Sequence, residues 1–157
     1  EREGHLDAVI TQNVDGLHGD AGSESVVELH GSNRRVRCDD CGDRRPAAPV
    51  FERATAGEVP PRCDCGGVYR PDVVLFGESL GDDPLARAQR FARESDVLLA
   101  AGSSLSVRPA ALLPTLAVDA GATLAVVNFE STPQDEAADY LFRADVTAVL
   151  PALGRRL

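Results

Sequence analysis

The chain has 157 residues, 43% of them hydrophobic, which suits one globular domain with a core, or a domain that carries a small insert. The chain has 16 basic residues, all arginine, and 25 acidic residues, which gives a formal net charge of -9. Such a surface lacks the basic face that nucleic-acid binding requires. No stretch approaches the roughly 20 apolar residues of a membrane span, and the first ten residues lack the layout of a signal peptide. We therefore expect a soluble, cytoplasmic protein with no membrane or direct nucleic-acid partner, whose oligomeric state the sequence leaves unknown.

Short apolar segments bounded by turn residues predict buried parallel strands. They lie at residues 7–11, 25–29, 72–76, 96–101 and 123–128. Because each is short and rich in Val, Leu or Ala, the pattern is typical of strands covered on both faces.

Two helical patterns lie between the later strands, at residues 83–94 and 109–119. In the second, Pro109 suits the first turn of a helix and Gly121 follows its end. The alternation of strand and helix predicts an α/β fold with an open parallel sheet and helices on both faces. The cysteine-containing residues 34–70 look like a small domain inserted into it.

Four cysteines form two close pairs, Cys38 with Cys41 and Cys63 with Cys65. Each pair stands beside glycine, and this spacing predicts a structural zinc site in which four thiolates close the coordination shell. A closed shell leaves no position for a substrate or an activated water, so the metal would stabilise the fold. The alternatives are free thiols or two disulfides, which an intracellular chain disfavours. On its own, such a module equally suits a zinc ribbon that binds partners.

Polar residues follow two of the predicted strands, at residues 12–16 (QNVDG) and 102–104 (GSS). Ligands of open α/β sheets bind beyond the carboxyl ends of the strands, and the backbone N–H groups of GSS could approach a phosphate there. Either segment could also be a plain turn, and for GSS alone the turn is favoured.

Taken together, six segments resemble the sirtuin family. They are TQNVDGLH at 11–18, ELHGS at 28–32, the two cysteine pairs, RPDVVLFGE at 70–78, AGSSLSV at 101–107 and VNFE at 127–130. The resemblance implies an NAD-dependent enzyme that removes acyl groups from protein lysine side chains, giving nicotinamide and O-acyl-ADP-ribose. It also implies a Rossmann-like, NAD-binding domain formed by residues 1–33 and 71–157, with a zinc-ribbon insert at 34–70 that holds one structural Zn²⁺.

The same resemblance implies roles for single residues. The general base would be His30, a role for which the pattern alone gives it no advantage over His5 or His18. The metal ligands would be the four cysteines. An acyl-lysine protein or peptide would add as a strand beside Val74, Phe76, Gly77 and Glu78. The residues expected to contact NAD are Gln12, Asn13, Val14, Asp15, Gly102, Ser103, Ser104, Asn128, Phe129, Glu130, Asp145 and Val146.

The sequence departs from the family at its beginning, because nothing before Thr11 resembles the family's Gly-rich phosphate loop. With no methionine in the chain, we expect the natural protein to continue upstream; otherwise this segment would have impaired catalysis. Acetyl is the default acyl group. Two other functions stay open, namely mono-ADP-ribosyl transfer to protein and a non-catalytic zinc-ribbon interaction module.

Overall fold

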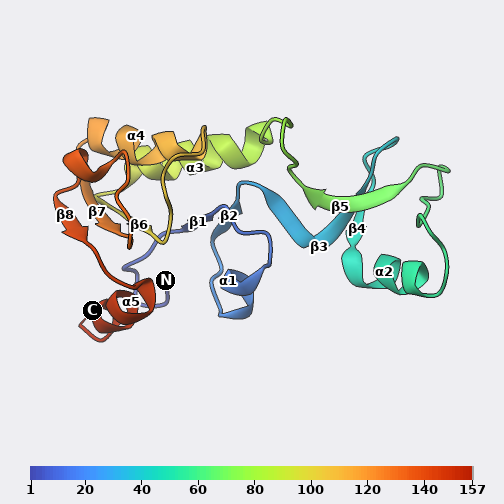
Figure 1. The fold of residues 1–157 in the computed structure, drawn as a ribbon, viewed down its shortest axis with the longest axis horizontal. Helices are drawn as coiled ribbons and strands as arrows, with labels where there is room; N and C mark the ends of the chain where they lie inside the picture. Colours follow the sequence, from blue (N-terminus) through green and yellow to red (C-terminus); the bar gives the residue numbers. More distant parts are fainter. Residues whose placement is uncertain (157) are drawn as a thin grey trace. The chain divides into compact units, whose positions relative to one another are not determined.

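The computed structural model describes residues 1–156, which form two compact units. The terminal unit comprises Glu1–Asp7 and Asp82–Leu157, and the cysteine unit comprises Ala8–Gly81. Figure 1 labels their helices and strands. The predicted domain boundaries near residues 34 and 70 fall inside the cysteine unit and stay a prediction.

The terminal unit is built on a parallel sheet with the strand order β6-β7-β8. Strand β6 spans Val97–Ala101, β7 spans Thr123–Val127 and β8 spans Tyr140–Phe142. The central strand supplies the core, because Leu124 and Val126 have no exposed surface. The predicted parallel arrangement of β6 and β7 is confirmed, but complete burial is wrong for β6. Exposed and half-buried residues alternate along this strand, and Val97 is 61% exposed because it points to the face of the sheet opposite the core of Leu124 and Val126.

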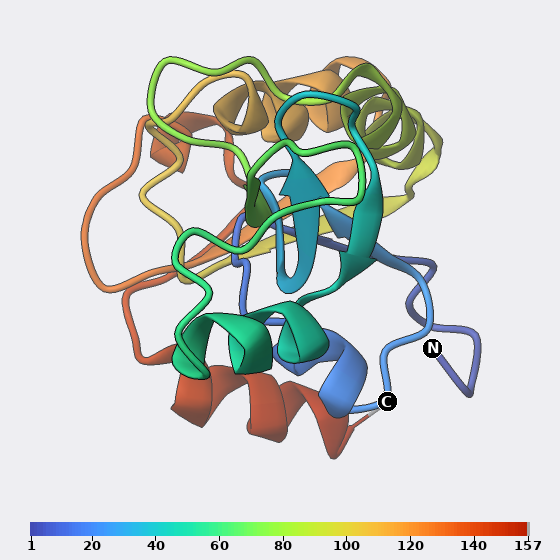
Figure 2. The ribbon, with the colours of Figure 1, turned by 90° about the vertical axis from the view of Figure 1, so that its right-hand side faces the viewer.

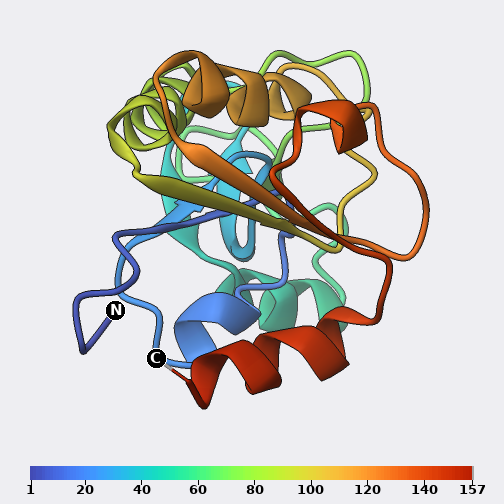
Figure 3. The ribbon, with the colours of Figure 1, turned by 90° about the vertical axis from the view of Figure 1, so that its left-hand side faces the viewer.

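Helices lie on both sides of this sheet, as the alternating pattern predicts, but the helix at residues 146–154 has no buried residue and leaves Leu99 on its side of the sheet 40% exposed. Helix α3 (Asp82–Glu94) and helix α4 (Leu113–Asp119) lie on one face, and helix α5 (Val146–Gly154) lies on the other (Figure 3). Short 3₁₀ turns at Ala110–Leu112 (η1) and Asp135–Ala137 (η2) complete the unit. The α/β fold is therefore confirmed.

The ends of these helices follow local sequence signals. Asp82 and Asp83 occupy the first turn of α3, where negative charge complements the helix dipole. The predicted start of the second helix at Pro109 is wrong, since Pro109 only precedes η1 and Pro114 is the proline in the first turn of α4. Its predicted end is confirmed by Gly121, whose φ of 100° suits glycine.

Helix α5 begins with a side-chain cap that can be tested. The Asp145 carboxylate accepts hydrogen bonds from the backbone N–H of Thr147 at 2.8 Å and from its hydroxyl at 2.7 Å. Asp145→Ala leaves that N–H without this acceptor, so thermal unfolding should begin about 2–4 °C lower. Asp145→Asn is the matched control, because an asparagine oxygen can also cap a helix. Equal melting temperatures for the two variants would contradict the capping role.

The cysteine unit contains a two-stranded parallel sheet and a three-stranded antiparallel sheet. The parallel pair is β1 (Val9–Thr11) with β2 (Val26–Glu28), and the short helix α1 (Leu17–Asp20) lies between them in sequence. Both strands were predicted. Val27 and Leu29 are almost fully buried, which agrees with the apolar pattern.

The antiparallel sheet has the order β4-β3-β5, and Figure 2 shows helix α2 (Ala47–Thr55) beside it. Its strands are β3 (Gly31–Cys38), β4 (Arg44–Pro46) and β5 (Tyr69–Val73). The prediction of a parallel strand at residues 72–76 is wrong, because β5 ends at Val73 and pairs antiparallel with β3. Apolar content signals a strand without specifying its partner, and this partner is rich in arginine.

A small core holds the residues around the cysteines. It consists of Val36, Cys38, Ala47, Val50, Cys63 and Tyr69, each at most 8% exposed. Two of the six members are themselves predicted zinc ligands. Among residues 1–156, no helix combines the length and apolar character that a membrane crossing requires.

Candidate functional site

His30 lies where the chain passes from the parallel sheet to the antiparallel sheet, between Glu28, the last residue of β2, and Gly31, the first of β3. Its ring Nδ1 is 3.1 Å from the carbonyl oxygen of Gln12, which follows β1. Because a carbonyl oxygen can only accept a hydrogen bond, Nδ1 carries the proton in this contact and Nε2 of the neutral ring keeps its lone pair. The arrangement gives His30 one free basic nitrogen of defined position.

The backbone around His30 is equally constrained. Its carbonyl oxygen accepts a hydrogen bond from the N–H of Val74 at 2.9 Å. Gly31 has a φ of 76°, and a Cβ added there would lie 2.1 Å from the carbonyl oxygen of Asp72. Only glycine therefore lets β5 approach the chain this closely next to the imidazole.

Replacing Gly31 with alanine should consequently move His30. We expect Gly31→Ala to lower the free energy of unfolding by about 1–3 kcal/mol and to reduce any activity that depends on His30, because both the backbone conformation and the contact with Asp72 are lost. Urea unfolding and turnover would measure the two effects. Gly57→Ala is the control, because its φ is 106° yet a Cβ there meets no described atom within 4 Å. Equal losses in the two variants would contradict the steric argument.

The predicted cofactor segment at residues 12–15 is held in place by its neighbours. The N–H of Asn13 donates to the Thr11 hydroxyl at 3.1 Å, and the carbonyl oxygen of Val14 accepts from the N–H of Asn33 at 2.8 Å. The carboxylate of Asp15 accepts from the N–H of Leu17 at 3.0 Å. The segment is thus a fixed loop beyond the carboxyl end of β1.

Arg34 fastens the same loop to β3, a role that the sequence pattern did not reveal. Its Nε donates to the carbonyl oxygen of Asp15 at 2.9 Å, and its Nη2 donates to the Asp20 carboxylate at 2.5 Å. Arg34 also passes so close to Gly16 that a Cβ there would lie 2.9 Å from Nε. An exposed arginine inside an arginine-rich strand carries no local signal for such contacts.

An open cavity of about 170 Å³ lies beside this loop. It includes the predicted cofactor residues Asn13 and Asp15, while His30 and Gln12 are not among its lining residues. The lining residues are Thr11, Asn13, Asp15, Gly16, His18, Gly19, Val26, Glu28, Ser32, Arg34 and Arg35. A cavity of roughly 150 Å³ is enough to admit a single aromatic ring.

The predicted substrate segment follows β5 as an exposed turn. The N–H of Glu78 donates to the carbonyl oxygen of Leu75 at 2.9 Å, and the N–H of Leu75 donates back to the Glu78 carboxylate at 3.1 Å. Gly77 has a φ of 90°, and the Phe76 side chain is fully exposed. Val74 joins this segment to His30 through the backbone hydrogen bond given above.

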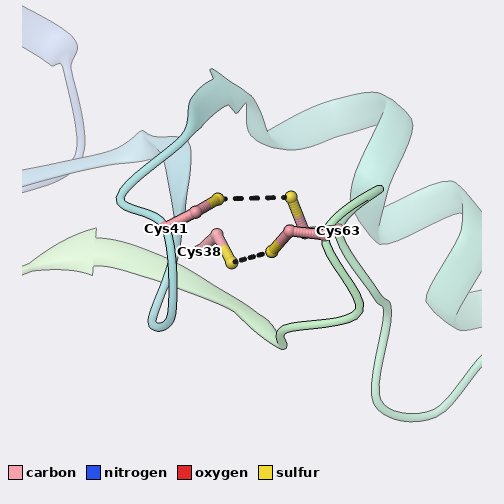
Figure 4. Close-up of side chains that lie close together, drawn as sticks. Cys38, Cys41 and Cys63 are labelled. Carbon is pink, nitrogen blue, oxygen red and sulfur yellow. Dashed lines mark hydrogen bonds between the residues drawn. The ribbon is translucent and has the colours of Figure 1, made fainter.

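The four predicted metal ligands converge on one point of the cysteine unit (Figure 4). Their sulfur atoms all lie within 4.8 Å of one another, and the Cys38–Cys65 and Cys41–Cys63 sulfur distances are 3.6 and 3.7 Å. A disulfide requires about 2.05 Å, whereas a tetrahedron with Zn–S bonds of about 2.3 Å has edges of about 3.8 Å. These distances exclude the disulfide alternative and match a Zn(Cys)₄ site.

Two of the thiols have pKa values that shift in opposite directions. A hydrogen bond from the Tyr69 hydroxyl, followed by one from the Cys65 backbone, lowers the pKa of Cys63 to about 6. The pKa of Cys41 is raised to about 12: the backbone near Asp43 lowers it, but the thiols of Cys65 and Cys38 and burial outweigh that contribution. A zinc ion binds thiolates, so its binding would favour the deprotonated form of all four thiols.

The remaining predicted cofactor residues gather at one edge of the terminal unit. The N–H of Gly102, after β6, donates to the carbonyl oxygen of Val127 at 2.9 Å, and the N–H of Asn128 donates to that of Phe142 at 3.1 Å. A Cβ on Gly102 would lie 3.5 Å from the Val146 side chain. The carboxyl ends of the three parallel strands thus bring these predicted residues together.

The other predicted residues near that edge have local contacts of their own. The Ser103 hydroxyl accepts from the N–H of Leu105 at 3.2 Å, and the carbonyl oxygen of Ser104 accepts from the Ser106 hydroxyl. The Asn128 amide donates to the carbonyl oxygen of Glu130 at 3.0 Å, and Phe129 between them is 69% exposed. Asp145 caps α5, as described above. Their predicted contacts with NAD remain predictions.

Comparison with known proteins gives one consistent result. Residues 1–109 match the Sir2 family. The chain is 63% identical to an NAD-dependent protein deacetylase of Haloarcula marismortui over 158 aligned positions, covering 100% of this chain and 61% of that protein. It is 48% identical to NAD-dependent protein deacetylase 2 of Streptomyces coelicolor, again covering 100% of this chain and 66% of that protein. The chain thus spans about three fifths to two thirds of these relatives.

Solved structures agree with the sequence comparison. A structure described as Sir2 with p53 peptide and NAD⁺ superposes with a TM-score of 0.91 at 36% identity, covering 99% of this chain and 65% of that one. A structure of Sir2 bound to an acetylated peptide gives a TM-score of 0.93 at 35% identity, with coverages of 99% and 65%.

Proposed function

The chain belongs to the Sir2 family, and from this premise we propose that the protein uses NAD to remove acyl groups, acetyl by default, from protein lysine side chains. The products would be nicotinamide and O-acyl-ADP-ribose. The observation that carries the proposal is the environment of His30, whose Nδ1 contacts the Gln12 carbonyl oxygen at 3.1 Å and whose Nε2 is therefore the basic nitrogen.

The chemistry divides between the cofactor and the chain. NAD, when bound, supplies a ribose carbon that the acyl oxygen of the substrate can attack as nicotinamide leaves. His30 then serves as the base that accepts a proton from a ribose hydroxyl at Nε2. The Gln12 carbonyl keeps the imidazole in the required tautomer, and the Val74 hydrogen bond links its backbone to the substrate segment.

The loop at residues 12–15 lies beyond the carboxyl end of β1, on the side of a parallel sheet where nucleotides bind, which supports its contact with the nicotinamide end of the cofactor. In the terminal unit, Gly102 and Asn128 lie beyond the carboxyl ends of β6 and β7, where open α/β sheets bind nucleotides. The cysteines contribute stability, because four thiolates complete a zinc shell.

The decisive experiment measures nicotinamide released by the full-length protein with NAD and an acetyl-lysine peptide. Release that depends on the acyl-lysine supports deacylation, and its absence favours a non-catalytic zinc-ribbon module. Radiolabelled ADP-ribose retained on protein would favour mono-ADP-ribosyl transfer. Parallel assays with acetyl, propionyl and succinyl peptides would determine the acyl preference.

Two further properties belong to the proposal. A cytoplasmic location is supported by the reduced thiols that a zinc site needs. The formal charge of -9 supports a protein or peptide partner over nucleic acid.

A further inference from the structure

Arg70, on β5, connects two parts of the cysteine unit that are far apart in sequence. Its Nε donates to the Asp39 carboxylate at 2.7 Å, and its Nη2 donates to the Glu78 carboxylate at 2.7 Å. Its Nη1 donates to the carbonyl oxygens of Val73 at 3.0 Å and Pro71 at 3.5 Å. One guanidinium therefore serves four acceptors, and the side chain is only 17% exposed.

The two carboxylates have different surroundings. Asp39 lies between Cys38 and Cys41, in the turn that presents two of the four sulfurs. Glu78 ends the predicted substrate segment and closes its turn through Leu75. We propose that Arg70 is a positioning residue that ties the zinc-binding turn to residues 74–78, so that the metal site sets the affinity for the acyl-lysine peptide. This inference rests on the proposed function.

The substrate segment needs such a tie because it has little apolar anchorage of its own. Leu75 is 53% exposed and Phe76 is fully exposed. At one end the segment is held by the hydrogen bond from Val74 to His30, and at the other by the Glu78 carboxylate. One Glu78 oxygen binds Arg70 while the other accepts from the Leu75 N–H, so the guanidinium fixes the carboxylate that closes the turn.

The geometry favours an arginine at this position. Exposed ion pairs usually contribute little, but a planar guanidinium that serves several acceptors at fixed angles loses less freedom for each bond that it makes. A lysine ammonium is a point charge and cannot satisfy Asp39, Glu78 and the Val73 carbonyl with the same fork. Substitution at Arg70 should therefore loosen residues 75–78 without removing a zinc ligand.

Arg45 provides a matched control. Its Nε donates to Asp43 at 2.7 Å and its Nη2 donates to Asp64 at 2.6 Å, so it also joins two carboxylates. Both of these partners lie within residues 34–70, between or beside the cysteines. A change at Arg45 thus perturbs the surroundings of the zinc site without touching the Glu78 connection.

The test compares Arg70→Gln, Arg70→Lys and Arg45→Gln in the full-length protein. For Arg70→Gln we expect the KM for an acetyl-lysine peptide to rise on the order of 3- to 10-fold, while the KM for NAD and the zinc content of one ion per chain stay unchanged. Arg70→Lys should give a smaller rise in the same direction. Arg45→Gln should leave the peptide KM at the wild-type value.

Hydrogen exchange makes the test independent of activity, and a second variant distinguishes the loss of this connection from simple unfolding. Hydrogen exchange without substrate should show faster exchange of the Leu75 and Glu78 amides in Arg70→Gln only. Asp39→Asn should raise the peptide KM in the same direction, and combining it with Arg70→Gln should add little further, because both break one connection. A peptide KM and amide exchange in Arg70→Gln equal to those in Arg45→Gln would overturn the proposal. If the wild type released no nicotinamide, the proposed function would fail, while amide exchange would still decide whether the tie exists.

Discussion

His30→Ala in the full-length protein is expected to reduce deacylation by about 100-fold or more. A positioned acid–base group contributes a factor of roughly 10² to 10⁴, and alanine removes the only imidazole that is oriented by the Gln12 carbonyl among the described residues. The formation of deacylated peptide at saturating acetyl-lysine peptide and NAD would measure the loss. Zinc content and the urea midpoint should stay close to the wild type, since His30 is not among the clustered metal ligands.

The control for this substitution is His5→Ala. His5 is exposed, and its only described ion pair, with Glu3, is long at 4.0 Å, so its loss should leave turnover unchanged. A His30→Ala protein that is folded, carries zinc and turns over near the wild-type rate would assign the base to another residue.

Replacing Cys38 or Cys63 with alanine is expected to unfold the region around the zinc site. Structural zinc bound by four thiolates contributes on the order of 10 kcal/mol, which becomes folding energy where little core exists. The core around the cysteines has six members, and two of these are cysteines and one is alanine. Only three larger side chains remain, those of Val36, Val50 and Tyr69. Metal analysis should find one zinc per wild-type chain and none in the variants, together with increased proteolysis between residues 34 and 70.

A chelator gives the same prediction without mutation. Deacylation should decline on the timescale of zinc loss, and added zinc should restore it if the chain has not aggregated. Residues 74–78 should lose protection from hydrogen exchange at the same rate, because β5 joins them directly to the zinc region. If zinc were removed and deacylation continued unchanged, the metal would not support the substrate segment.

Part of the fold is predictable from the sequence because some signals are local. The apolar β7 and the amphipathic α3 have the expected ranges within one or two residues. Strand β3 was missed because Asn33, Arg34 and Arg35 occupy its exposed positions, and in its second half only Val36 and Cys38 are buried. Strand β5 was predicted to be parallel for a related reason. Its own residues do not indicate that its neighbour is β3 or that the two strands are antiparallel.

The candidate site shows the same division. Cysteine spacing alone predicts the metal site, and the sulfur distances agree with it. The position of His30 could be given only by resemblance, because its orientation depends on a carbonyl 18 residues away. Arg70 was part of a quoted motif, but its role depends on Asp39, which lies 31 residues earlier in the chain. Contacts between residues so far apart in the sequence leave no periodic pattern of residue types from which they could be predicted.

The start of β3 and the end of β5 have a consequence for how this protein can vary. Gly31 pairs directly with Val73, so the long excursion between them leaves and returns at neighbouring points of the chain. Its length can therefore change without altering the separation of its two ends. Insertions, deletions and substitutions in the segment between Gly31 and Val73 can therefore occur while His30, which precedes Gly31, keeps its position. Related proteins could in this way bind different partners through this segment and keep the same position for His30.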